Sequence, residues 1–241
     1  VIPVDSEHFS LSRCLRGHES ETVEIILTAS GGPFFGRELS GLRDVTVSEV
    51  LDHPTWKMGK KVTVDSAHLL NKGLEVIEAH WLFDAAPDDI QVVVHPQSIV
   101  HSLVHYRDGS VLAQMGAPDM RPAIACALSW PARLPLDLAV PDFARLGKLT
   151  FESPDPQRFP CLGLAAEAAE RGGTYPAVLN AANEAAVAAF LERRLAFVDI
   201  LAMSAYAYYR GALNGWRVFR QLSLTIGAYS LTKLVAIVSL V

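Results

Sequence analysis

Three carboxylates have the types and spacing of a divalent-metal site. Asp5 and Glu7 stand two residues apart, so on an extended chain their side chains project to the same side. Glu75 lies farther along, on the polar face of an expected helix. Ligands that are all oxygen suit Mg²⁺ or Mn²⁺ rather than Zn²⁺. The alternative for Asp5 and Glu7 is an ordinary solvated loop, because most acidic side chains are simply exposed.

A second group of residues has the chemistry of a phosphate site. The segment Ser30-Gly31-Gly32 presents backbone N–H groups without obstructing side chains, although a tight turn at a strand end is the alternative. Ser66, Asn71 and Lys72 offer a hydroxyl, an amide and an ammonium near a helix start, where the helix dipole favours an anion. The alternative there is an exposed helix face with a Lys72–Glu75 ion pair.

Histidines and an aromatic residue form a third group. His53 and Trp56 share a loop with Gly59 and can form a lid over a ligand. His95 and His101 lie on expected strands, where a lone histidine is more often packed than catalytic.

The hydrophobic pattern predicts the elements that position these residues. The expected strands are 23–28, 61–64, 91–95, 98–106 and 111–115, with a hairpin turn at 107–110. One helix is expected over about 66–83, capped by Asp65 or Ser66. Its apolar stripe is Leu70, Leu74, Ile77 and Trp81.

These elements predict an α+β catalytic domain over residues 1–130 with a mixed or antiparallel sheet. Six prolines mark residues 131–160 as a linker. Alanine-rich segments at 162–171, which stops at Gly172-Gly173, and 177–194 predict a partial all-helical C-terminal domain over 161–200.

Residues 201–241 are expected to form an atypical hydrophobic tail. They contain no Asp or Glu, three Arg and one Lys. The stretch from Gln221 to Val241 is long enough to span a membrane, but its polar residues argue against a span. The other interpretations are a poorly packed extension or sequence foreign to the preceding domain.

Composition narrows the class of protein. With 241 residues, 50% hydrophobic, and a net charge of −5, the chain is too apolar to be disordered and has no electrostatic reason to bind nucleic acid. Three cysteines without a CxxC pair suit a reducing compartment. Because the chain starts at Val1 without an initiator Met, we expect that an N-terminal part is missing.

Seven motifs occur in an order that resembles one family. They are VDSEH at 4–8, LTASGGPF at 27–34, HPTWKMGKK at 53–61, VDSAHLLNKGLE at 64–75, HPQSIVHS at 95–102, PDMR at 118–121 and LNAANE at 179–184. Together they closely resemble 1-deoxy-D-xylulose 5-phosphate reductoisomerase, from residue 1 to about residue 200.

The resemblance implies roles for individual residues. The divalent-metal ligands it implies are Asp5, Glu7 and Glu75. The substrate-binding residues are Ser6, Glu7, Ser30, His53, Ser66, Asn71, Lys72 and Glu75, of which Ser30, Ser66, Asn71, Lys72 and His53 surround the phosphate. The catalytic residues are Glu7, Glu75 and His53; Gly59 lies near the nicotinamide; Trp56, Met120 and His101 line the pocket.

The family's reaction rearranges 1-deoxy-D-xylulose 5-phosphate and reduces it to 2-C-methyl-D-erythritol 4-phosphate in non-mevalonate isoprenoid biosynthesis. The resemblance implies NADPH, Mn²⁺ or Mg²⁺ with Co²⁺ as a further option, and a homodimer. It also implies a bacterial cytoplasmic location, with a plastid location left open.

The sequence departs from the family in four respects. Nothing reads G-x-G-x-x-G after a strand, so we expect that the NADPH-binding domain is missing and that this chain alone is inactive. The alternative function is a metal- and phosphosugar-binding fragment without hydride transfer. His68 stands where the family has a small hydroxyl residue, and Phe9–Arg13 is less apolar than usual. The resemblance ends near residue 201.

Overall fold

The computed structural model describes residues 1–214, which divide into two compact units. Of the described residues, the sheet unit comprises 1–31 and 78–155, and the helical unit comprises 32–77 and 156–214. The division falls inside helix α4 (Leu70–Phe83), so this one element belongs to both units. Residues 32–77, expected in a first domain with residues 1–31, therefore group with the C-terminal helices, because their apolar side chains are buried against those helices.

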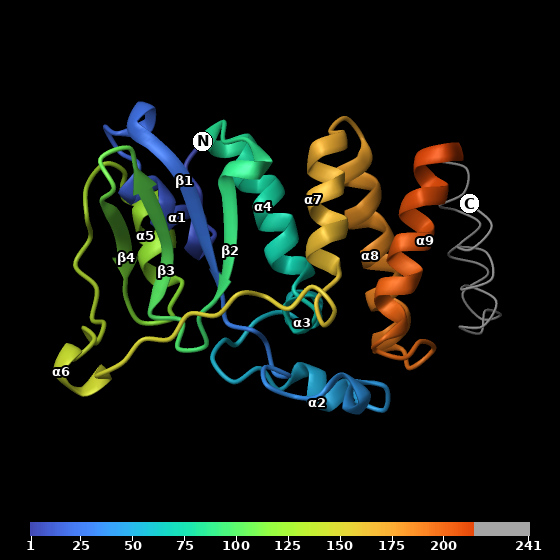
Figure 1. Ribbon diagram of the computed structural model, residues 1–241. Coiled ribbons are helices and arrows are strands. Elements are labelled where there is room, and N and C mark those ends of the chain that lie inside the picture. The colour runs from blue at the N-terminus through green and yellow to red at the C-terminus, as the bar shows by residue number, and fades with distance from the viewer. Residues whose placement is uncertain (215–241) are drawn as a thin grey trace. The chain divides into compact units, whose positions relative to one another are not determined.

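A four-stranded mixed sheet forms the sheet unit (Figure 1). Its strands are β1 (Thr22–Ala29), β2 (Ile90–Val94), β3 (Val100–Tyr106) and β4 (Val111–Met115), in the order β2-β1-β3-β4. β1 pairs in parallel with β2 and antiparallel with β3, and β3 pairs antiparallel with β4 across the predicted hairpin turn. The expected α+β class and mixed sheet are confirmed.

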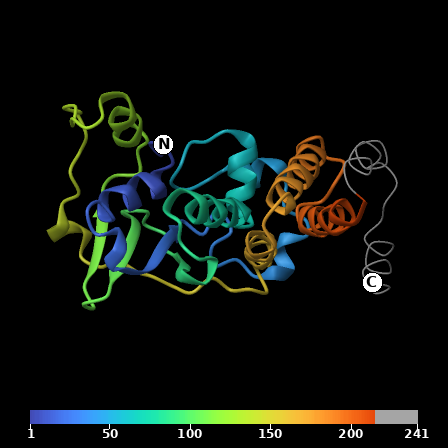
Figure 2. The same ribbon diagram turned by 90° about the horizontal axis from the view of Figure 1, so that it is seen from above.

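Helix α1 (Ser6–Cys14) covers one face of this sheet, and α5 (Arg121–Ser129) lies on the same side (Figure 2). Leu11 and Cys14 are among the buried residues of α1. Tyr106 Oη donates a 2.5 Å hydrogen bond to the carbonyl of Cys14, and Ser102 Oγ donates one of 3.1 Å to the carbonyl of Glu7. Both ends of α1 are thereby attached to β3.

The segment expected as a linker is irregular over most of its length. It contains the short helix α6 (Phe143–Leu146). Glu152 pairs with Val94 by two backbone hydrogen bonds of 2.8 and 2.9 Å. Short 3-10 helices occur at Glu19–Glu21, Leu39–Leu42 and Pro87–Asp89.

The helical unit contains α2 (Val47–Leu51), α3 (Lys60–Ala67), α7 (Cys161–Arg171), α8 (Tyr175–Leu191) and α9 (Asp199–Asn214). Helix α8 packs against both α7 and α9, and also contacts α3 (Figure 1). One buried core joins Val64 and Ala67 of α3 to Val187 of α8 and Ile200 of α9. The predicted end of α7 at Gly172 is confirmed, with this glycine at φ 62°.

The predicted strand at 61–64 is wrong, because these residues form α3. The alternation of polar and apolar residues in Lys61–Val64 favours a strand. In the structure, however, Thr63, Val64 and Ala67 are buried, and these three side chains share one helix face. The predicted single helix over 66–83 is also wrong: it is broken at Leu69, whose φ of 59° is left-handed. Asp65 is not an N-cap but lies buried within α3.

Two further expectations change. Trp81 was expected on the apolar stripe of α4, yet it is 68% exposed, whereas Leu70 and Ile77 are buried. Residues 201–214, expected in the tail, form most of α9, where Met203, Ala207 and Tyr208 are buried. The interpretations of residues 215–241, including the membrane span, lie outside the described residues. Among residues 1–214, none of the helices combines the length and apolarity that crossing a bilayer requires.

Candidate active site

The N-terminus of α1 carries the first acidic group. Asp5 is the N-cap residue, and Ser6 and Glu7 occupy the first turn. The hydroxyl of Ser6 donates a hydrogen bond to the carboxylate of Glu7. Ser102 on β3 also donates a hydrogen bond to the backbone carbonyl of Glu7, so the sheet fixes the position of the backbone from which this carboxylate projects.

A histidine and a further acid lie beside Asp5. Asp5, His8 and Glu78 each present a ligand atom within 4.8 Å of the others. His8 is fully buried and stacks on the ring of Phe83, with centroids 6.1 Å apart and planes 8° from parallel. Its Nδ1 lies 3.8 Å from Glu78 Oε1. His8 and Glu78 were not predicted from the sequence as members of a site, although Glu78 stands one helical turn after Glu75.

Glu75 is buried and firmly held on α4. It is 3% exposed, and Lys72 is 4% exposed. Asn71 Nδ2 donates to Glu75 Oε1 at 2.6 Å, and Lys72 Nζ donates to Oε2 at 2.5 Å. The exposed-face alternative is therefore wrong for Lys72 and Glu75. Carboxylate oxygens such as those of Glu75 are the ligands that Mg²⁺ and Mn²⁺ prefer.

The glycine loop after β1 approaches α3 directly. Gly32 has φ 69°, and a Cβ placed there would lie 2.8 Å from the carbonyl oxygen of Ser66 and 3.0 Å from Ala67 Cα. Only glycine fits this position, since both the backbone angle and the space exclude a side chain. The loop is thus more than a turn at a strand end, because it places the Gly32 backbone close to the backbone of Ser66.

His53 lies in the segment between α2 and α3. Its Nδ1 accepts hydrogen bonds from the backbone N–H groups of Thr55 at 3.2 Å and Trp56 at 3.0 Å. Burial lowers the pKa of His53 below its ordinary value of 6.5. Both observations favour the neutral ring with its proton on Nε2. Gly59 caps α3 with an ordinary φ of −63° and open space around it.

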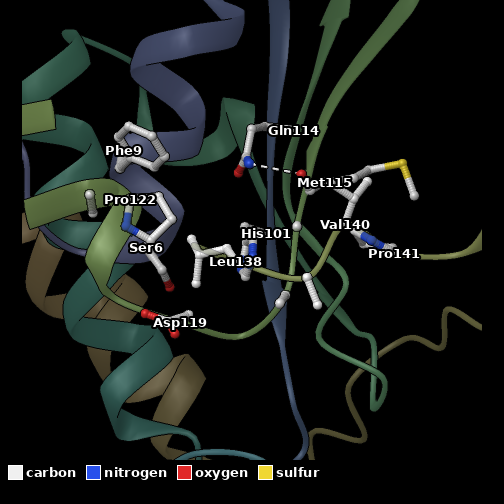
Figure 3. Close-up of a pocket in the computed structure, with 14 residues that line it drawn as sticks. Ser6, Phe9, His101, Gln114, Met115, Asp119, Pro122, Leu138, Val140 and Pro141 are labelled. Carbon is white, nitrogen blue, oxygen red and sulfur yellow. Dashed lines mark hydrogen bonds between the residues drawn. The ribbon is translucent and has the colours of Figure 1, made fainter. Parts of the chain in front are cut away.

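A cavity of about 210 Å³ opens in the sheet unit between α1, the ends of β3 and β4, and residues 138–141 (Figure 3). Ser6, His101 and Asp119 contribute polar atoms, and Phe9 and Leu138 contribute apolar wall. His101 is placed by Thr28, whose Oγ1 donates a 2.8 Å hydrogen bond to its carbonyl. Of the residues expected as pocket walls, His101 lines this cavity, whereas Met120 caps α5.

The remaining predicted residues are dispersed over the two units. Ser30 directly follows β1, and Ser66 lies in the last turn of α3. His95 is a structural histidine, as the packed alternative expected. Its Nδ1 lies 2.8 Å from the carbonyl of Thr150, and its Nε2 accepts from the backbone of Ile99 and Val100 at 3.2 Å each.

The carboxylates on α1, and the buried Glu75 and Lys72 with the half-buried Asn71 on α4, are residue types typical of proteins that bind a divalent cation and an anion. Comparisons with known proteins identify the family. Residues 1–83 match the family model of the 1-deoxy-D-xylulose 5-phosphate reductoisomerase C-terminal domain, and residues 115–218 match that of the DXP reductoisomerase C-terminal domain.

Individual relatives agree with these matches. The 1-deoxy-D-xylulose 5-phosphate reductoisomerase of Chlorobium chlorochromatii is 60% identical over 204 residues, which are 84% of this chain and 53% of that protein. The enzyme of Pseudomonas syringae pv. tomato is 55% identical over 206 residues, 83% of this chain and 52% of that protein. The chain therefore spans about half the length of these curated relatives.

Solved structures agree as well. The Zymomonas mobilis enzyme in complex with NADPH is 40% identical with a TM-score of 0.83, covering 94% of this chain and 61% of that one. A DOX-P reductoisomerase in complex with NADPH, fosmidomycin and magnesium is 37% identical with a TM-score of 0.83, covering 99% of this chain and 62% of that one. The chain belongs to the 1-deoxy-D-xylulose 5-phosphate reductoisomerase family, and both of its matches are to models of that family's C-terminal region.

Proposed function

We propose that this chain is the metal- and phosphosugar-binding portion of a 1-deoxy-D-xylulose 5-phosphate reductoisomerase, the enzyme that forms 2-C-methyl-D-erythritol 4-phosphate for isoprenoid biosynthesis. The observation that carries the proposal is the buried Glu75 carboxylate, held by Asn71 and Lys72 at 2.6 and 2.5 Å. Burying a charged group costs free energy unless the group is paired and hydrogen-bonded, and buried charged groups are concentrated at functional sites. The buried Glu75 therefore favours a binding site over a chance ion pair on the surface.

Asp5, Glu7 and Glu75 are the proposed ligands of the metal ion. Their donor atoms are all carboxylate oxygens, which fits Mg²⁺ or Mn²⁺, with Co²⁺ also tolerated. Magnesium is present in three of the related structures. When bound, such an ion polarises a substrate carbonyl and stabilises enolate charge. Glu7 and Glu75 hold it, and the Ser6–Glu7 hydrogen bond orients one of these carboxylates.

Ser30, Ser66, Asn71, Lys72 and His53 are the proposed binding residues for the substrate phosphate. Lys72 supplies the positive charge, and the Ser66 backbone is held against the Gly32 loop. Anchoring the phosphate provides binding energy away from the reacting carbons. His53 and Trp56 share an irregular segment whose closing would exclude water from the reacting groups.

Hydride transfer is proposed to need more than this chain. NADPH occurs in two of the related structures. Among residues 1–214, Gly59 is the one proposed cofactor contact, and it has neither a positive φ nor a close neighbour that would require glycine. The residues described do not by themselves fit NADPH. We therefore propose that the chain binds metal and phosphosugar without catalysing the complete reaction.

A homodimer is proposed for the chain. β4 is an outer strand of the sheet, and Val111 and Leu112 on it are about half exposed. Exposed apolar residues on an edge strand favour association with another chain.

A cytoplasmic location is supported by three buried cysteines that form no disulfide and by the bacterial source of the relatives.

Calorimetry with Mn²⁺ and fosmidomycin tests the proposed binding function. We expect heat of binding for the wild-type chain and for Glu170→Gln, an exposed acid on α7 that serves as a control. Glu75→Gln should abolish it. Equal heats for Glu75→Gln and wild type would refute the assignment of Glu75. An NADPH-oxidation assay with the substrate and Mn²⁺ tests the second part, since turnover by this chain would refute the need for further residues.

A further inference from the structure

A buried polar pair joins helix α3 to helix α8. Asn183 Nδ2 donates a 2.7 Å hydrogen bond to Asp65 Oδ1, across 118 positions of sequence. Asp65 is 1% exposed and Asn183 is fully buried. The second carboxylate oxygen of Asp65 lies 2.8 Å from Lys61 Nζ, which also donates to Asn180 Oδ1 at 3.2 Å. Both oxygens of Asp65 are therefore engaged, and two residues of α8 participate.

Helix α3 carries part of the proposed phosphate site. Ser66 directly follows Asp65, and the carbonyl of Ser66 lies so close to Gly32 that a Cβ on Gly32 would be 2.8 Å from its oxygen. The chain then passes through Leu69, at φ 59°, into α4 with Asn71 and Lys72. A shift of Asp65 would consequently move Ser66, and through the short connection also the start of α4.

The start of α4 has its own close contact with the C-terminal helices. A Cβ at Gly73 would lie 2.5 Å from the Cβ of Ala165 on α7, so the two helix backbones approach as closely as glycine permits. Gly73 follows Lys72 directly. Both helices that carry proposed phosphate-binding residues are thus seated on the bundle formed by α7 and α8.

We propose that the Asp65–Asn183 pair is a positioning device: it fixes α3 on the C-terminal helices and thereby sets the geometry of the proposed phosphate-binding residues. This inference rests on the proposed function for the identity of the ligand. Asp65 and Asn183 are positioning residues and bind no ligand themselves. A buried carboxylate with its amide partner stabilises less than well-packed apolar side chains, but the directional, charge-assisted hydrogen bond between them favours one arrangement of the two helices.

Hydrogen exchange of residues 60–72 and calorimetry with Mn²⁺ and fosmidomycin test this on the 241-residue chain. Asn183→Ala removes the donor to Asp65, so we expect faster exchange in α3. We also expect fosmidomycin affinity to fall on the order of tenfold, equivalent to about 1.4 kcal/mol. Ala207→Gly is the matched control, because it weakens α9, a helix that contributes neither residue of the Asp65–Asn183 pair. It should lower the melting temperature but leave α3 exchange and affinity unchanged.

A reciprocal exchange separates positioning from general stability. Asn183→Asp places two carboxylates together and should raise α3 exchange further. Asp65→Asn combined with Asn183→Asp restores one amide and one carboxylate, and should recover both exchange and affinity. The proposal is overturned if Asn183→Ala exchanges at α3 like Ala207→Gly, or if the double variant recovers nothing. A wild-type chain that binds no fosmidomycin would instead overturn the proposed function, while the exchange rates still decide whether the pair fixes α3.

Discussion

Replacing Gly73 by alanine should destabilise the chain, even though alanine is the better helix former. The new Cβ would lie 2.5 Å from Ala165 Cβ and 3.6 Å from the carbonyl oxygen of Cys161. Carbon atoms prefer about 3.5–4.0 Å, so α4 and α7 would have to separate by on the order of 1 Å. Overpacking of this kind costs about 1–3 kcal/mol. The gain in helix propensity, up to about 1 kcal/mol, offsets only part of that cost.

Gly163→Ala provides the matched control. Gly163 is also a helical glycine, on α7, but it is exposed and a Cβ there would meet no atom within 4 Å. We expect this change to stabilise the chain by up to about 1 kcal/mol. The double variant Gly73→Ala with Ala165→Gly moves one methyl group from α7 to α4, so it should recover the packing part of the loss caused by Gly73→Ala.

Thermal and urea unfolding measure these differences. A net loss of about 1 kcal/mol corresponds to a melting temperature lower by about 2–4 °C in a chain of this size. The two glycine substitutions should therefore shift the melting temperature in opposite directions. If Gly73→Ala stabilised the chain as much as Gly163→Ala does, the close packing of α4 on α7 would be refuted, together with its part in seating the proposed phosphate site.

Two more changes test the site, and a third tests the burial of His68. Gly32→Ala should lower both stability and fosmidomycin affinity, because φ is 69° and the Cβ would lie 2.8 Å from the Ser66 carbonyl oxygen; unchanged calorimetric affinity would contradict this. Lys72→Met leaves the buried Glu75 charge without its ammonium, so urea unfolding should show a loss of about 3–5 kcal/mol, recovered in part by adding Glu75→Gln. Burial lowers the pKa of His68 in the folded chain, so its unfolded form binds a proton more readily. Stability should fall as the pH drops below 6.5, the ordinary value, and His68→Thr should remove that part of the slope; an identical melting-temperature profile would argue otherwise.

Much of the sheet unit could be predicted from local pattern. The apolar runs around β1, β2 and β3 and the Asp108-Gly109 turn before β4 correspond to elements of the structure, because strand alternation and turn chemistry are properties of neighbouring residues. The segment 61–64 could not be predicted in this way. Its alternation favours a strand, but a helix buries Val64 and Ala67 against α8, and this contact involves residues more than 100 positions away.

The candidate site divides in the same manner. The types of its residues are local facts: Asp5-x-Glu7, the two glycines after Ser30 and Asn71-Lys72 with Glu75 were all sequence signals. The burial of Lys72 and Glu75 was not, since a polar helix face is exposed unless another element covers it. His8 and Glu78 were missed for the same reason: their proximity to Asp5 depends on α1 lying beside the end of α4 within the sheet unit.

Sequence alone was sufficient for the chemistry that these side chains offer and for the family to which the motifs belong, because both depend on residue type and order. The fold decides which of those groups are buried, which are paired and which helix supports them. Asp65 illustrates the difference. In sequence it is a candidate helix cap, but its carboxylate hydrogen-bonds to Asn183, 118 positions away, because only the packing of α3 on α8 brings a buried amide within reach.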